Sequence, residues 1–177
     1  PEEMREYFAK QSGLPPLAGE LKIPPNLYLW ATMNSADQGV APVDTAFKRR
    51  WSFEFLPIDA GEEKHDLCEV TLSNGVRTGW NSLRHTINHH LTTGVSGVTE
   101  DKLIGPFFLS QAELSQECFD DAFKNKLLMY LFEDVLKRRQ SGFFAEGLHT
   151  FSELLAAYDR GEEIFAFPLN ELAEIEV

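Results

Sequence analysis

Residues 27–56 read LYLWATMNSADQGVAPVDTAFKRRWSFEFL, and this stretch decides the fold class that the sequence predicts. Leu27–Met33 is a nearly continuous apolar run of strand length, which is typical of a strand buried on both faces of a parallel sheet. After a polar loop, Asp44 places a carboxylate at the start of a short helix over Thr45–Arg50. Trp51–Leu56 then alternates apolar and polar residues, as a second strand does. The order strand, helix, strand indicates part of an α/β sheet domain.

The rest of the chain is expected to be mostly helical. Asn74-Gly75 indicates a turn, and the apolar spacing around it predicts helices on both sides. The predicted helices are Glu62–Val70, Trp80–Leu91, Asp120–Gln140 and Phe151–Tyr158. A further helix end is expected in residues 1–10. The sequence thus predicts two parts, a partial sheet domain at residues 1–57 and a helical domain at residues 58–177.

Composition narrows the classes of function. Among 177 residues, 43% are hydrophobic, which is enough for a core and argues against disorder. The formal net charge of −12 argues against direct binding to DNA or RNA phosphates, because such domains are normally basic. There is no CxxC pair, no transmembrane run and no signal peptide pattern, so we expect a cytoplasmic protein without a membrane partner. A first residue other than Met suggests a piece of a longer protein.

The residue types around the first predicted strand suggest phosphate chemistry. Asn34 follows that strand directly, at the sheet edge where ligands of open α/β sheets bind. Its amide could orient a water molecule for attack on a terminal phosphate. Arg49 and Arg50 end the short helix, where a guanidinium can project toward a neighbouring subunit. Arginine suits this task because its planar fork matches phosphate oxygens and keeps its charge.

Three segments of this region resemble a known family. Ile23–Tyr28 (IPPNLY), Ala31–Asp37 (ATMNSAD) and Val43–Phe53 (VDTAFKRRWSF) are similar to the McrB-type AAA+ motor of methylation-dependent restriction systems. The resemblance is strong over residues 20–57 and looser over 60–145. It implies an α/β fold that is the C-terminal part of an AAA+ P-loop NTPase sheet domain, followed by a mostly helical lid.

The resemblance also implies a role for individual residues. Asn34 matches the sensor 1 asparagine, Asp37 the acidic residue of the family signature, and Asp44 the aspartate at the helix start. Arg49 matches the arginine finger, which acts on the nucleotide of a neighbouring subunit, and Arg50 the arginine beside it.

The implied cofactor is ATP or GTP with Mg²⁺, held by the parent module and not by this chain alone. Gln38 stands where the family signature usually has arginine, and Lys48 replaces the first of three arginines. These two departures leave the choice between ATP and GTP open.

Two elements of such a module are missing from the sequence. No GxxxxGK[ST] occurs in residues 1–177, and no apolar strand ending in an acidic pair precedes residue 20. In the sheet that the resemblance implies, the phosphate-loop strand lies between Leu27–Met33 and Trp51–Leu56. Both predicted strands would therefore lack their shared partner. We expect the chain alone to be inactive toward nucleotides and its sheet part to be poorly stable.

The resemblance implies three partners: further copies in an AAA+ ring, a McrC-like nuclease subunit, and DNA bound through a separate domain. One alternative belongs to another class, a non-catalytic AAA+ remnant or adaptor that regulates a motor or nuclease. Another alternative is a MoxR-like chaperone motor, which the signature Thr32–Asp37 (TMNSAD) disfavours.

Other conspicuous residues have simpler interpretations. His85, His89 and His90 are expected on the surface of an amphipathic helix, since no third zinc ligand follows the usual spacing. Lys137–Arg139 complements a helix dipole. The Phe107–Phe108 and Phe143–Phe144 pairs are expected in the core of the helical part, with a protein interface as the alternative.

Overall fold

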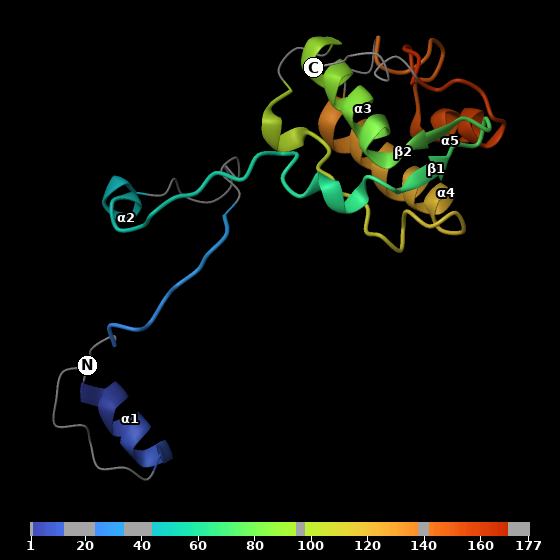
Figure 1. Ribbon diagram of the computed structural model, residues 1–177. Helices are drawn as coiled ribbons and strands as arrows, with labels where there is room; N and C mark the ends of the chain where they lie inside the picture. Colours follow the sequence, from blue (N-terminus) through green and yellow to red (C-terminus); the bar gives the residue numbers. More distant parts are fainter. Residues whose placement is uncertain (1, 13–23, 34–43, 95–97, 138–141, 170–177) are drawn as a thin grey trace. The chain divides into compact units, whose positions relative to one another are not determined.

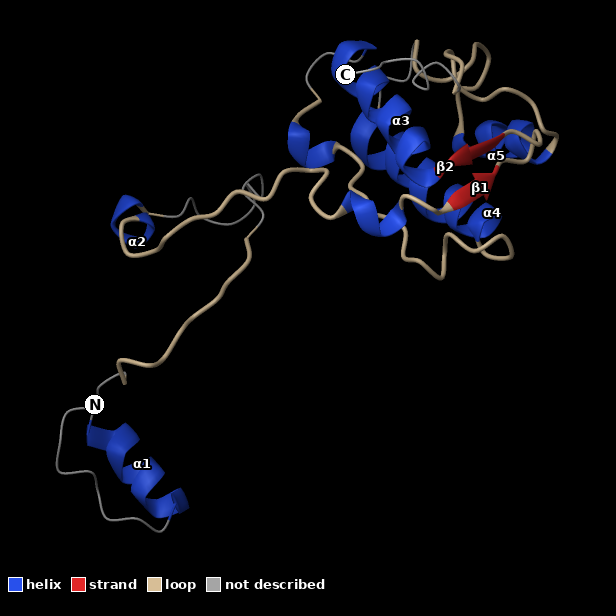
Figure 2. Ribbon diagram, viewed as in Figure 1, coloured by secondary structure: helices blue, strands red, loops and turns tan. Residues whose placement is uncertain are grey.

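The computed structural model describes residues 2–12, 24–33, 44–94, 98–137 and 142–169 (Figure 1). It divides into two compact units, Pro1–Asn34 and Ser35–Val177. The described residues are mostly helical, with one small two-stranded antiparallel sheet (Figure 2). The helical character predicted for the second part is confirmed, whereas no P-loop sheet is present among the described residues. The predicted boundary after residue 57 stays a prediction.

Neither predicted strand of the sheet domain is a strand in the described structure. Leu27–Met33 and Trp51–Leu56 form no ladder with any described residue. Apart from the half-buried Trp51, their large apolar side chains are exposed: Trp30 is 89% and Phe55 71% exposed. The prediction of strands here is wrong for this chain as it stands. The physical reason is that a strand exists only when a neighbour satisfies its backbone N–H and C=O groups.

Among the described residues of the N-terminal third, two segments are helical. Helix α1 covers Glu2–Ser12, with Glu2 and Glu3 in its first turn and Lys10 in its last, which confirms the helix expected in residues 1–10. Helix α2 covers Thr45–Lys48, within the helix predicted over Thr45–Arg50.

A short hairpin replaces most of one predicted helix. The 3₁₀ turn η1 covers Glu62–His65, and strand β1 (Glu69–Thr71) then pairs antiparallel with β2 (Arg77–Gly79). A helix over Glu62–Val70 was therefore the wrong expectation beyond its first turn. Val70 and Leu72 both face the core, two residues apart, and this alternation fits a strand.

The hairpin turn is the one that Asn74-Gly75 predicted. The Gly75 N–H donates to the carbonyl of Leu72, and the Val76 N–H donates to Asn74 Oδ1 at 3.1 Å. Gly75 has φ 82°, a left-handed conformation that glycine adopts without steric cost.

Helix α3 spans Trp80–Gly94 and supplies the centre of the core. Trp80 is fully buried and its Nε1 donates to the Pro106 carbonyl at 2.8 Å. Asn88 binds the backbone of Ile104 twice, with its Nδ2 donating to the carbonyl and its Oδ1 accepting from the N–H. These bonds fix the segment after the 3₁₀ turn η2 (Glu100–Lys102) against the helix.

The next helix is assigned in three consecutive pieces: α4 (Phe119–Ala122) and the π-helical η3 (Phe123–Leu128) and η4 (Tyr130–Leu136). This run confirms the predicted helix over most of Asp120–Gln140. Its last piece ends at Leu136, and the next residue, Lys137, has φ 44°, which lies outside the helical range.

Helix α5 (Phe151–Asp159) begins with a capping box. Thr150 Oγ1 accepts from the Glu153 N–H at 3.2 Å, and Glu153 Oε2 accepts from the Thr150 N–H at 2.9 Å. The helix agrees with the predicted Phe151–Tyr158.

Aromatic side chains from residues 143–165 complete the hydrophobic core. Phe143 and Phe144 are buried, and Phe144 forms an isolated antiparallel bridge with Phe165. The prediction that this Phe pair is core is confirmed. For the other pair the prediction is confirmed for one residue only: Phe108 packs against the core, whereas Phe107 is 54% exposed.

No helix among the described residues is long and apolar enough to span a bilayer.

Candidate functional site

The predicted finger residues lie at the end of helix α2. The Arg49 N–H donates to the Thr45 carbonyl at 3.1 Å and the Arg50 N–H to the Phe47 carbonyl at 3.0 Å, so both residues close the helix. Both side chains are exposed and neither forms a salt bridge with another described residue. Asp44 is the N-cap, but its side chain makes no capping hydrogen bond. The geometry thus leaves both guanidinium groups available to a ligand or partner.

The other predicted site residues cannot be placed relative to these. Asn34 and Asp37 lie outside the described residues, as does Gln38. Their assignments therefore remain predictions from sequence, and so does a contact between Asn34 and a nucleotide.

A second group of polar residues surrounds a buried arginine that the sequence analysis did not single out. Arg84 is fully buried on α3, and its guanidinium forms salt bridges with Asp59 through Nη1 and with Glu62 through Nη2. Its Nε donates to Asn81 Oδ1 at 3.0 Å. His85 Nε2 lies 2.8 Å from the same Glu62 carboxylate. These contacts connect η1 and the preceding turn to α3.

One signal in the sequence could have found this cluster. Arg84 lies four residues after Trp80 and three before Ile87, so it falls inside the apolar stripe of the helix. An arginine in such a stripe needs carboxylate partners, because an unpaired buried charge is costly.

Asp59, Glu62 and His85 are the group within the described ranges whose side chains could hold a metal ion. Their ligand atoms lie within 4.8 Å of one another. Arg84 already supplies positive charge to both carboxylates, however, and its Nη2 lies 3.3 Å from His85 Nε2. A cation would have to bind beside a fixed guanidinium, so we interpret the cluster as structural. The predicted surface position of the histidines holds for His89, which is exposed.

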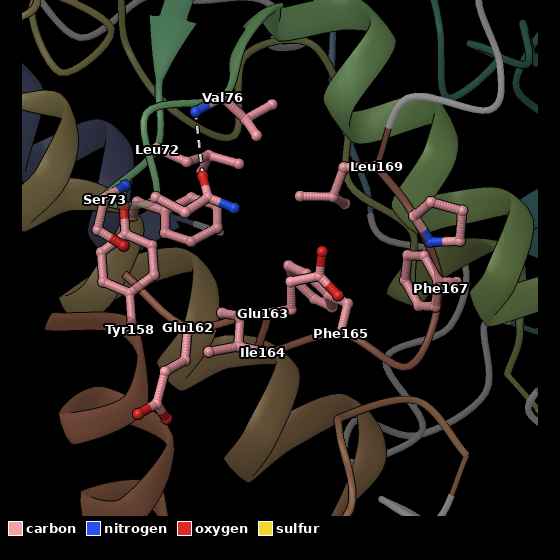
Figure 3. A pocket seen from close by; sticks show the side chains of 13 residues that line it. Leu72, Ser73, Val76, Tyr158, Glu162, Glu163, Ile164, Phe165, Phe167 and Leu169 are labelled. Carbon is pink, nitrogen blue, oxygen red and sulfur yellow. Dashed lines mark hydrogen bonds between the residues drawn. The ribbon is translucent and has the colours of Figure 1, made fainter. Parts of the chain in front are cut away.

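A pocket of about 100 Å³ opens between the hairpin turn, helix α5 and the segment after it (Figure 3). Its walls are mainly apolar, with Leu72 from the hairpin and Ile164, Phe165 and Leu169 from the later segment. The Tyr158 hydroxyl accepts from the Ser73 N–H at 3.3 Å. Burial, followed by the charge of Asp120, raises the pKa of Tyr158, so this phenol stays neutral at physiological pH.

Two glutamates line this pocket in different ways. The Glu162 carboxylate accepts two hydrogen bonds from Arg160, at 2.6 and 2.9 Å, and this pairing lowers its pKa. Figure 3 shows that it points away from the hollow, on the side of Tyr158. Glu163 is exposed, and its carboxylate lines the pocket on the side of the hollow (Figure 3). It forms no ion pair with any residue that the structure describes.

Comparison with known proteins gives one informative match. The chain is 45% identical over 154 residues to the component YdiS of the type II restriction enzyme BsuMI of Bacillus subtilis (strain 168). The match covers 85% of this chain and 43% of the relative, so the chain spans less than half of that protein's length. No protein-family model matches the sequence, and no solved structure matches it.

Proposed function

We propose that this chain is part of a nucleotide-hydrolysing component of a DNA restriction system. The observation that carries the proposal is its 45% identity over 154 residues to a type II restriction enzyme component. The resemblance of residues 20–57 to the McrB-type AAA+ motor supports the nucleotide part. In this proposal the chain contributes a sensor asparagine, Asn34, and an arginine finger, Arg49, and residues 58–177 form the helical lid.

The structure is consistent with a finger that acts outside its own subunit. Arg49 lies at the end of a four-residue helix, is exposed, and is not held by any carboxylate among the described residues. The mostly exposed apolar side chains of Leu27–Met33 and Trp51–Leu56 fit two segments that would form strands beside a partner strand from another segment. We propose that this segment carries the phosphate loop and the magnesium-holding carboxylates. The nucleotide would be ATP or GTP, bound between subunits of a ring.

The further partners are those of a restriction system. We propose a nuclease subunit that cuts DNA and a separate domain that reads it, because the acidic charge of this chain, −12, disfavours direct contact with phosphates.

The experiment compares the complete gene product with its Asn34→Ala variant in phosphate release from ATP and from GTP in the presence of Mg²⁺. We expect one of the nucleotides to be hydrolysed, and Asn34→Ala to slow hydrolysis about 100-fold while nucleotide still binds, because the attacking water loses its orientation. Ser35→Ala is the matched control and should keep its rate. Hydrolysis of neither nucleotide by the unchanged protein would favour the non-catalytic adaptor instead.

A further inference from the structure

The pocket beside Tyr158 combines apolar walls with a single uncompensated carboxylate. Leu72, Ile164 and Leu169 provide aliphatic surface, and Phe165 and Phe167 provide aromatic surface. No lysine, arginine or histidine lines it among the described residues. Glu163 reaches the hollow without an ion-pair partner in the described chain, whereas Glu162 is neutralised by Arg160 (Figure 3).

We propose that this pocket receives one lysine or arginine side chain from a basic, apolar segment of a partner protein. The aliphatic stem of such a side chain would lie on Leu72 and Leu169, as long cationic side chains do on apolar surface. Its charged head would meet the Glu163 carboxylate. A cavity of about 100 Å³ suits one side chain and is too small for a helix.

Charge complementarity selects this occupant over two others. The sequence after Leu169 (NELAEIEV) contains three glutamates and no basic residue, so its charge matches that of Glu163 and the two would repel. A purely apolar side chain would cover Glu163 and remove its water without replacing it, which is unfavourable for a carboxylate. A basic partner also matches the net charge of −12, which would speed the encounter. This inference does not depend on nucleotide hydrolysis.

The probes are three peptides that differ in one side chain: acetyl-Leu-Lys-Leu-amide, the same peptide with norleucine in place of lysine, and the same with glutamate. Each is titrated into the 177-residue chain, and the methyl NMR signals of Leu72, Val76 and Leu169 are followed. We expect saturable shifts with the lysine peptide, with an affinity on the order of millimolar for so small a ligand. The norleucine peptide should bind about fivefold more weakly, and the glutamate peptide more weakly still.

Two variants assign the preference to one carboxylate. Glu163→Gln should abolish the preference for lysine over norleucine, a loss of about fivefold. Glu162→Gln, its neighbour on the same segment, should leave the preference unchanged because its carboxylate is already paired and points away. The proposal is overturned if the norleucine peptide binds as tightly as the lysine peptide, if Glu163→Gln leaves the preference intact, or if none of the peptides shifts the three methyl signals.

Discussion

Replacement of Arg49 by alanine is expected to slow nucleotide hydrolysis by the complete gene product about 10³–10⁵-fold, the usual contribution of an arginine finger. The reason is that the guanidinium neutralises charge that develops on the transferred phosphoryl group. In this structure Arg49 is exposed and its charge is not engaged by any described carboxylate, so the group is free for this role. The measurement is single-turnover phosphate release at saturating nucleotide, together with nucleotide affinity, which should change little.

Two neighbouring substitutions are the controls for this prediction. Lys48→Ala removes a cation from the same helix and should leave the rate within a few-fold, because a like charge in the wrong position does not reach the phosphate. Arg50→Ala tests the main competitor for the finger. If Arg50→Ala abolishes hydrolysis and Arg49→Ala does not, the finger is Arg50, and if neither matters, this helix supplies no finger at all.

The double substitution Asp59→Asn and Glu62→Gln is expected to destabilise the chain by about 3 kcal/mol, near the lower end for breaking a buried ion pair. Arg84 has no exposed side-chain area, so without these carboxylates its charge is buried and uncompensated. The carboxylates themselves are 43% and 38% exposed, which is why the loss lies at the lower end. Urea unfolding followed by far-UV circular dichroism measures the change.

Arg84→Met is the matched control for this double variant. It keeps much of the apolar stem and leaves two carboxylates that water can reach, so its cost should be smaller, about 1–2 kcal/mol. A larger loss for Arg84→Met than for the double variant would show that Arg84 acts through packing and not through its charge.

The helices with regular apolar spacing could be predicted from sequence. The structure of segments that need a pairing partner could not. Trp80–Leu91 and Phe151–Tyr158 carry their apolar stripe within the segment itself, and the structure has them as α3 and α5. The run Leu27–Met33 has strand composition, but its pairing partner does not lie among the described residues, so local pattern could not decide the outcome. A helix was wrongly predicted over Glu62–Val70. The segment begins with charged residues, and the alternation of buried and exposed side chains that indicates a strand begins only at Val70.

In the candidate site, too, local features could be predicted from sequence and long-range contacts could not. The sequence placed Arg49 at the end of a short exposed helix, and the structure agrees. Neither the Arg84 cluster nor the pocket was expected. An arginine inside the apolar stripe of α3 indicates a buried ion pair, but the position does not tell which residues pair with it. Arg84 meets Asp59 across 25 positions, and Tyr158 meets Ser73 across 85. Contacts at such separations are set by tertiary packing, which a single sequence does not specify by local pattern.

In the proposed ring, a sensor asparagine and an arginine finger from this region act in one active site but come from different subunits. The most direct measurement mixes Asn34→Ala and Arg49→Ala subunits of the complete gene product and records nucleotide hydrolysis. Each variant alone should be nearly inactive. In an equal mixture, about a quarter of the ring interfaces would join an intact asparagine to an intact finger, so hydrolysis should rise well above either variant. A mixture no more active than the average of the two variants would contradict the account.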